Sequence, residues 1–143
     1  MVSTRDVARY FLSIQDEEAG ELITNMKLQK LVYYAQGFHL AVYDKPLFDA
    51  RIKAWAHGPV VPQLWHDYKE YGSAPIPVEP FDIMRLSPDQ RELLDEVYIS
   101  YGQFSAWRLR EMTHAEPPWK IAFDGDGVIS DKEMRKYFRT LVA

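Results

Sequence analysis

One stretch of the chain, residues 24–43, is apolar around most of a helical circumference, and it restricts the possible folds more than any other feature. It begins near residue 24 or 25 and continues to about residue 43. A helix that is apolar on most sides is typically the central helix of a bundle. One stripe at helical spacing consists of the apolar residues Leu28, Leu31, Val32, Ala35, Phe38 and Val42. Tyr33, Gln36 and Leu40 lie on a neighbouring face.

Five further helices are predicted from N-terminal caps followed by apolar residues at helical spacing. We expect the first to end within residues 16–20, where Gly20 suits a left-handed stop, and the fifth to end before Pro117-Pro118. The start signals are Ser3 with Asp6, Pro62, Ser87-Pro88 with Gln90, Ser105, and Ser130 with Glu133.

Residues 48–56 are predicted to be extended, because Ile52 and Ala54 alternate with Lys53 and Trp55. His57-Gly58-Pro59 follows as a turn. The sequence therefore predicts a mainly α protein, a single compact helical domain over residues 1–143 with about six helices and one or two short β-strands.

Composition excludes several classes of protein. The 143 residues contain no cysteine, which removes disulfides, thiolate metal sites and a cysteine nucleophile. The chain has 17 basic and 21 acidic residues, a formal charge of −4, so nucleic acid is not expected as a partner. Neither a signal peptide nor a membrane span is evident, and we expect a cytoplasmic protein without a membrane partner.

No motif predicts an assembled catalytic site, a metal or a cofactor. The dipeptide His66-Asp67 is shared with the metal-dependent HD phosphohydrolases, and His39 and Asp95 are the further ligands such a site would need. This hydrolase is kept as an alternative. Residues 124–127 (DGDG) begin like a calcium loop, but the later ligand positions of that loop do not match, and a tight turn before the last helix is predicted instead.

Three motifs, taken in order, carry a family resemblance. They are MKLQKLVYYAQG (residues 26–37), WAHGPV (55–60) and LREMTHAEPPW (109–119). The chain thereby resembles the Panacea domain, the SocA-like or phage GepA-like antitoxin domain, from about residue 7 to the last helix. This resemblance implies a mostly helical fold with a little strand.

The resemblance also implies a partner and a mode of action. The partner is a cognate toxin encoded by the adjacent gene, neutralised by direct protein–protein binding and without catalysis. A proteolytic adaptor that delivers the toxin to a AAA+ protease is the alternative within the same family. A homodimer and a toxin–antitoxin hetero-oligomer are both compatible with the abundant aromatic residues. We expect no additional DNA-binding domain.

Eight residues are candidates for partner binding: Lys27, Lys30, Tyr33, Tyr34, Trp55, His57, His114 and Trp119. The alternative is that the motif residues among them hold the second helix against the His57 turn and the fifth helix. Tyr33 and Tyr34 are adjacent, so we expect at least one of them at the surface. Trp65, Trp107 and Trp119 are expected to be more buried than exposed.

Overall fold

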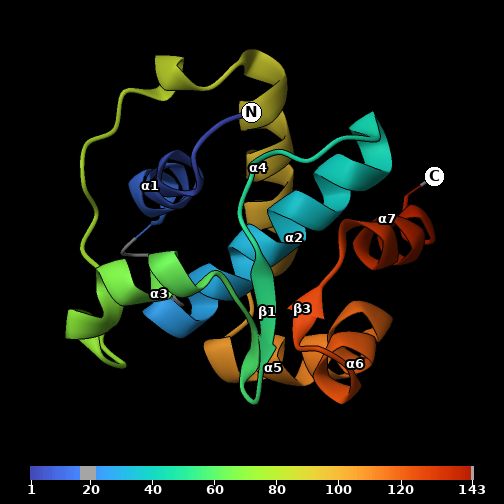
Figure 1. Ribbon diagram of the computed structural model, residues 1–143. Helices are drawn as coiled ribbons and strands as arrows, with labels where there is room; N and C mark the ends of the chain where they lie inside the picture. Colours follow the sequence, from blue (N-terminus) through green and yellow to red (C-terminus); the bar gives the residue numbers. More distant parts are fainter. Residues whose placement is uncertain (17–21, 143) are drawn as a thin grey trace.

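The computed structural model describes residues 1–16 and 22–142, and helix α2 (Asn25–Tyr43) crosses the middle of it (Figure 1). Helices and strands contact α2 along its length, namely α1 (Thr4–Ile14), α3 (Pro62–Tyr68), α4 (Pro88–Tyr101), α5 (Ala106–His114), α7 (Asp131–Arg139) and β2 (Gly58–Val60). The predicted central helix is therefore confirmed. Its N-cap is Thr24, whose hydroxyl accepts a hydrogen bond from the Lys27 backbone N–H.

The predicted serine caps are present at α1, α4, α5 and α7, whereas α3 begins at the predicted Pro62 without a side-chain cap. Ser3, Ser105 and Ser130 each accept a backbone hydrogen bond, and Ser87 with Gln90 forms a reciprocal capping box. Two short 3-10 helices, Lys69–Tyr71 and Ile83–Arg85, lie between α3 and α4. Helix α1 ends at Ile14, and the predicted stop at Gly20 falls outside the described residues.

Helix α6 (Pro117–Asp124) was not predicted. Pro117 and Pro118 do follow the end of α5, as expected, but they also occupy the first positions of a new helix. Proline is tolerated there because its missing N–H would have no partner within the helix. A proline pair thus ends one helix and begins the next within three residues.

Three short strands form an antiparallel sheet in the order β2-β1-β3. Strand β1 (Ile52–Trp55) lies within the predicted extended segment and pairs with β2 through Lys53 opposite Val60. The chain does turn at His57, but Gly58 and Pro59, predicted as part of that turn, belong to β2. Strand β3 (Val128–Ile129) pairs with β1 on its other side, which was not predicted. The predicted tight turn precedes β3, with Gly127 at a positive φ of 83°.

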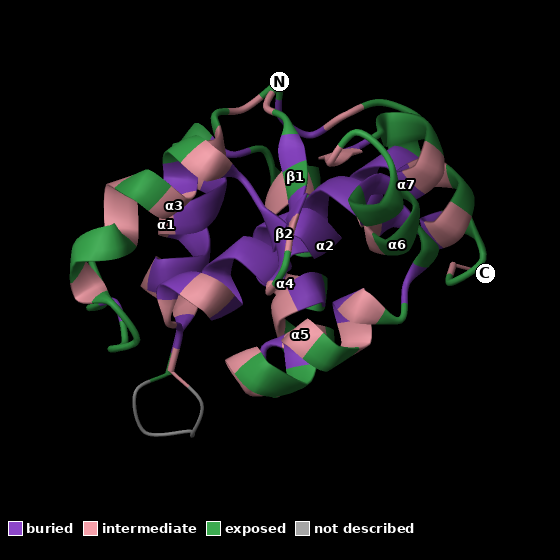
Figure 2. Ribbon diagram, turned by 60° about the horizontal axis from the view of Figure 1, so that its bottom comes forward, coloured by how far each residue is buried: buried purple, intermediate pink, exposed green. Residues whose placement is uncertain are grey.

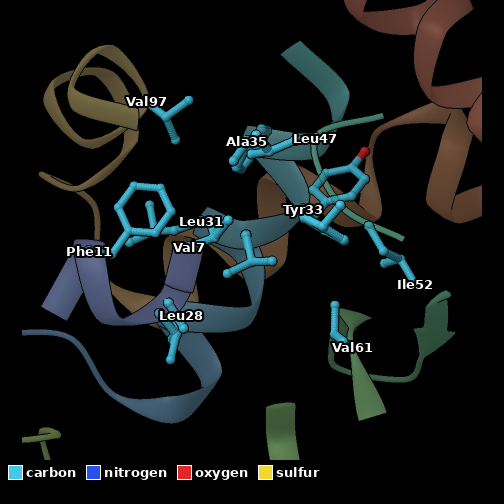
Figure 3. Close-up of a cluster of buried hydrophobic side chains, with 14 of the residues drawn as sticks. Val7, Phe11, Leu28, Leu31, Tyr33, Ala35, Leu47, Ile52, Val61 and Val97 are labelled. Atoms are coloured by element: carbon cyan, nitrogen blue, oxygen red, sulfur yellow. The ribbon is translucent and has the colours of Figure 1, made fainter. Parts of the chain in front are cut away.

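The core surrounds α2, and the buried surface continues onto the helices and strands around it (Figures 2 and 3). Two glutamines inside the helix attach it to neighbouring loops. Gln36 accepts a hydrogen bond from the Leu47 backbone at 2.8 Å and donates one to the Phe48 carbonyl at 2.9 Å. Gln29 accepts one from the Val61 backbone at 3.0 Å. These bonds satisfy loop groups that burial would otherwise leave unpaired.

None of the helices in the described part of the chain combines the length and the hydropathy that crossing a bilayer requires.

Candidate partner-binding surface at the β1–β2 turn

The turn between β1 and β2 packs directly on α2. Gly58 has a φ of 120°, a conformation that side-chain-bearing residues rarely adopt. A Cβ atom at this position would also lie 2.7 Å from Cε of Lys30. Glycine therefore allows the turn to approach the helix closely, and this approach brings His57 over Lys30.

Side chains from the third sequence motif hold the two carbonyl groups at the end of β1. Nε2 of His114, at the end of α5, lies 2.7 Å from the Ala56 carbonyl oxygen. Nε1 of Trp119, in α6, donates to the Trp55 carbonyl oxygen at 2.9 Å. Two motifs about 60 residues apart in sequence thus meet at one turn, and α2 supplies the third motif beneath them.

Lys30 lies beneath the turn with no exposed side-chain surface. Its Nζ is 3.5 Å from Nδ1 of His57. Burial, and secondarily the charge of Arg110, lower the pKa of Lys30 to about 7. Burial also lowers the pKa of His57, and the charges of Lys30 and Arg110 lower it further. The pKa of His114 is lowered by burial first, and then by Arg110 and Lys30.

Tyr33 and Tyr34 are both completely buried, so the expectation that at least one faces solvent is wrong. The reason is that α2 is packed on all sides around these two positions, so that both adjacent side chains point into packed structure. Their hydroxyl groups donate to the two oxygens of Glu116, at 2.9 and 2.8 Å. Burial raises the pKa of both tyrosines, and the charge of Glu116 raises it further.

Glu116 is a buried acid that the sequence analysis did not select, although it lies within the third motif. Burial raises its pKa to about 7, while the hydrogen bonds from Tyr34 and Tyr33 act in the opposite direction. Its position directly before Pro117 and three residues before Trp119, within the motif, was the available signal, but nothing in the sequence paired it with the tyrosines.

The eight predicted partner-binding residues divide by position. Lys27, Lys30, Tyr33 and Tyr34 are buried within α2, and Nζ of Lys27 donates to the Gly102 carbonyl at 2.6 Å. The other four, Trp55, His57, His114 and Trp119, are partly exposed and lie together around the turn. Burial withdraws the first group from direct contact with a partner in this conformation.

Trp65 of α3 completes the aromatic surface around the turn. Its ring lies 5.1 Å from that of His57 and 6.2 Å from that of Trp55. On the other side, the rings of His114 and Trp119 are 4.1 Å apart. We call these five partly exposed residues, Trp55, His57, Trp65, His114 and Trp119, the turn surface. Phe123, 48% exposed, stacks on Trp119 and extends it.

The expectation that Trp107 is more buried than exposed is wrong. Trp65 and Trp119 are half-buried, but Trp107 is 62% exposed, because it occupies the outer face of α5 close to its N-terminus. The guanidinium carbon of Arg110 lies 4.7 Å from its ring centre. This cation–π contact holds Arg110, also partly exposed, on the same face of α5.

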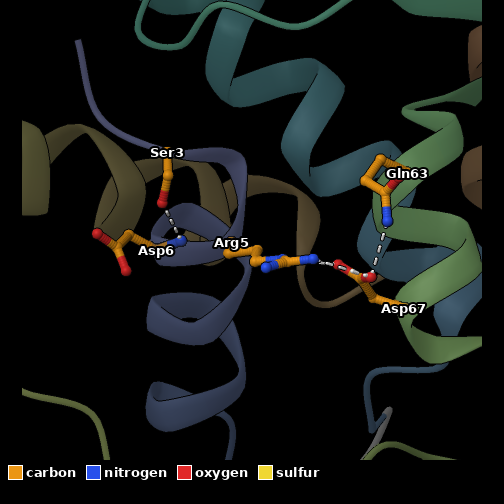
Figure 4. A network of polar contacts seen from close by, with 5 residues as sticks. All are labelled: Ser3, Arg5, Asp6, Gln63 and Asp67. Carbon is orange, nitrogen blue, oxygen red and sulfur yellow. Dashed lines mark hydrogen bonds and ion pairs between the residues drawn. The ribbon is translucent and has the colours of Figure 1, made fainter.

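The residues of the alternative hydrolase site are not grouped together, and Asp67, His39 and Asp95 each bond to other parts of the protein. Asp67 accepts hydrogen bonds from Arg5 of α1 at 3.0 and 3.3 Å and from Gln63 at 3.1 Å (Figure 4). His39, buried as a core imidazole, bonds to the Lys45 carbonyl, and Asp95 accepts from Tyr10. Across residues 1–16 and 22–142, no three His, Asp or Glu side chains are grouped to hold a metal ion.

Comparisons with known proteins agree with the sequence motifs. Residues 28–120 match the family described as "Antitoxin SocA-like, Panacea domain". The chain is also similar to Antitoxin SocA of Caulobacter vibrioides (strain NA1000 / CB15N), with 31% identity over 136 residues, covering 82% of this chain and 72% of that protein. No solved structure gives a significant match. The family match begins in α2 and ends just after Trp119, so it spans the whole turn surface.

Proposed function

Because the chain belongs to the SocA-like Panacea domain family, we propose that it is an antitoxin that neutralises a cognate toxin by direct protein–protein binding. We further propose that the toxin is encoded by the adjacent gene and that neutralisation occurs in the cytoplasm. The antitoxin acts by covering a surface of the toxin and not by chemical conversion of a substrate.

The observation that supports this proposal most is the rigid presentation of aromatic side chains on the turn surface. Tryptophan, tyrosine and arginine are enriched among the residues that dominate binding energy at interfaces. Here Trp55, Trp65 and Trp119 are partly exposed and lie around one turn. Two side-chain hydrogen bonds, from His114 and Trp119, hold that turn in place. A surface that is already ordered loses little conformational entropy on binding.

The experiment is co-expression with the adjacent gene, followed by co-purification and measurement of the mass of the complex. Wild-type protein should restore growth and form a stable complex, whose mass distinguishes a heterodimer from a larger hetero-oligomer. Trp55→Ala combined with Trp65→Ala should weaken the complex at least tenfold while leaving the fold intact. Ile99→Ala is the matched control, since Ile99 is 76% exposed on α4 and does not belong to the turn surface.

Two outcomes would contradict the proposal. Soluble protein that neither binds the toxin nor restores growth would exclude direct neutralisation. Toxin that disappears only when a AAA+ protease is present would support the adaptor alternative instead.

A further inference from the structure

In the described part of the chain, Lys30 is a buried lysine without an anionic partner. Lysine is rarely fully buried unless it is paired, because removing a charge from water costs several kcal/mol. In the part of the chain that the structure describes, its Nζ has one polar contact, at 3.5 Å to Nδ1 of His57, and no carboxylate lies within ion-pair distance. A neutral imidazole at this distance compensates the lost hydration of an ammonium group only weakly.

The groups around Lys30 add positive charge. The charge of Arg110 acts against the charged form of Lys30, and the charges of Arg110 and Lys30 act against the charged forms of His57 and His114. The nearest buried acid of the site, Glu116, is already bonded to Tyr33 and Tyr34. The turn therefore combines four basic groups without a described acid that neutralises them.

Three of these four groups reach the surface. His57, Arg110 and His114 are partly exposed, and Lys30 lies immediately below His57. The rings of Trp55 and Trp65 lie on one side of these groups and that of Trp119 on the other. A partner packed on these rings would displace water, and charge interactions are stronger where water is excluded. Such a surface suits an anion delivered by another protein.

We propose that the turn surface, together with the adjoining Arg110 of α5, binds an aspartate or glutamate side chain of the partner through His57, His114 and Arg110, with Lys30 as a positioning residue beneath His57. This inference rests on the proposed function, since the acid belongs to the toxin. Arg110 offers a bidentate contact to a carboxylate and is held by Trp107. The carboxylate supplies the negative charge that the isolated chain lacks at this position.

Binding of a carboxylate should be accompanied by proton uptake. The pKa of Lys30 is about 7 and that of His57 lies below its usual value, so near neutral pH part of the Lys30–His57 pair is uncharged. A neighbouring carboxylate favours the charged forms. The complex should therefore be tighter at pH 6 than at pH 8, a dependence to which His114 also contributes.

The first test uses a probe that does not depend on the toxin. N-acetyl-glutamate amide is titrated into the full chain at fixed ionic strength while the ring signals of His57 and His114 are followed by NMR. We expect saturable shifts that are absent with N-acetyl-glutamine amide and at least tenfold weaker in Arg110→Gln. Equal responses to the charged and the neutral probe would overturn the inference.

The second test uses the toxin complex and separates a positioning role of Lys30 from a structural one. Lys30→Met should raise the melting temperature of the free protein, because it removes a buried amine that has no anionic partner, yet weaken the complex about tenfold and reduce the proton uptake measured in two buffers of different ionisation enthalpy. If Lys30→Met does not fold, Arg110→Gln provides the same binding comparison.

These tests distinguish failure of the inference from failure of the proposed function. A wild-type complex that is unaffected by Lys30→Met and Arg110→Gln, and that forms without proton uptake, leaves the antitoxin proposal standing and disproves the carboxylate site. Absence of any wild-type complex contradicts the antitoxin proposal, and the peptide-probe titration then still decides whether the turn binds carboxylates.

Discussion

The indole N–H of Trp119 donates to the carbonyl oxygen of Trp55 at 2.9 Å and thereby joins α6 to the end of β1. Strand β1 is the central strand of the sheet, between β2 and β3. Because Trp55 is its last residue, the Trp55 carbonyl lies where the strand ends and the turn begins. The bond fixes the turn and the tryptophan ring together. A partner that contacts one of them meets both in a defined arrangement.

Trp119→Phe should destabilise the protein by about 1–3 kcal/mol, because the substitution keeps an aromatic ring but leaves the Trp55 carbonyl without its donor. Urea unfolding followed by circular dichroism measures the change. Phe123→Leu is the control, since Phe123 stacks on the same ring but is 48% exposed and makes no hydrogen bond through its side chain. An equal loss in both variants would show that ring packing, and not the hydrogen bond, holds the turn.

Gly37→Ala should destabilise the packing of α2 against α7, although alanine is the better helix former. A Cβ atom at this position would overlap the ring of Phe138, which is fully buried. Overpacking of this kind typically costs about 1–3 kcal/mol. Combining Gly37→Ala with Phe138→Leu should cost less than the sum of the two single changes, and additive free energies of unfolding would contradict the contact.

Glu116 should make the protein less stable as the pH rises from about 4.5 to about 7. Its pKa is about 7 in the folded protein and 4.5 when unperturbed, so within this range the folded state binds more protons than the unfolded state. Stability then falls with increasing pH, by an amount on the order of 3 kcal/mol. Chemical unfolding of wild type and Glu116→Gln across this range isolates the effect as their difference.

The matched control for this experiment is Glu111→Gln. Glu111 is exposed, and its ion pair with Arg108, at 3.8 Å, lies at the surface, where such pairs contribute little. Its substitution should therefore leave the pH dependence of unfolding close to wild type. A Glu116→Gln profile that parallels wild type would mean that the carboxyl group of Glu116 titrates normally in the folded protein.

His66→Ala combined with Asp67→Asn tests the remaining hydrolase alternative. Asp67 pairs with Arg5 and Gln63 at the surface, where such contacts contribute little to stability. We therefore expect a loss of less than about 1 kcal/mol in stability and unchanged growth rescue. Thermal unfolding and co-expression with the toxin gene are the two measurements. Loss of rescue in a folded variant, together with phosphoesterase activity of the wild type that requires a divalent metal, would revive the enzymatic alternative.

Local signals in the sequence identified most of the fold. The serine caps and the apolar period located α1, α2, α4, α5 and α7, because capping and periodicity act over neighbouring residues. The same local reasoning missed α6, since a proline pair is a stop signal for the helix before it and a start signal for the helix after it. Strand β3 has two residues and depends on its pairing with β1, a contact across about 75 residues.

The site was only partly predictable. The motifs included the side chains that meet at the turn, but helical spacing does not reveal how much of α2 is enclosed. Adjacent positions therefore predict that Tyr33 and Tyr34 are not both buried, whereas both are, and Glu116 accepts a hydrogen bond from each. The exposure of Trp107 was missed for the converse reason, since a large aromatic side chain is more often buried than exposed.

The enclosure of α2 assigns stability and recognition to different parts of the chain. Its polar side chains bind loops and carbonyl groups from within, whereas the residues of the turn surface belong to the hairpin, α3, α5 and α6. A library that randomises Trp55, Trp65, Trp107 and Phe123 could therefore be selected for new specificity on an unchanged scaffold. Variation in α2 would mainly return proteins that fail to fold.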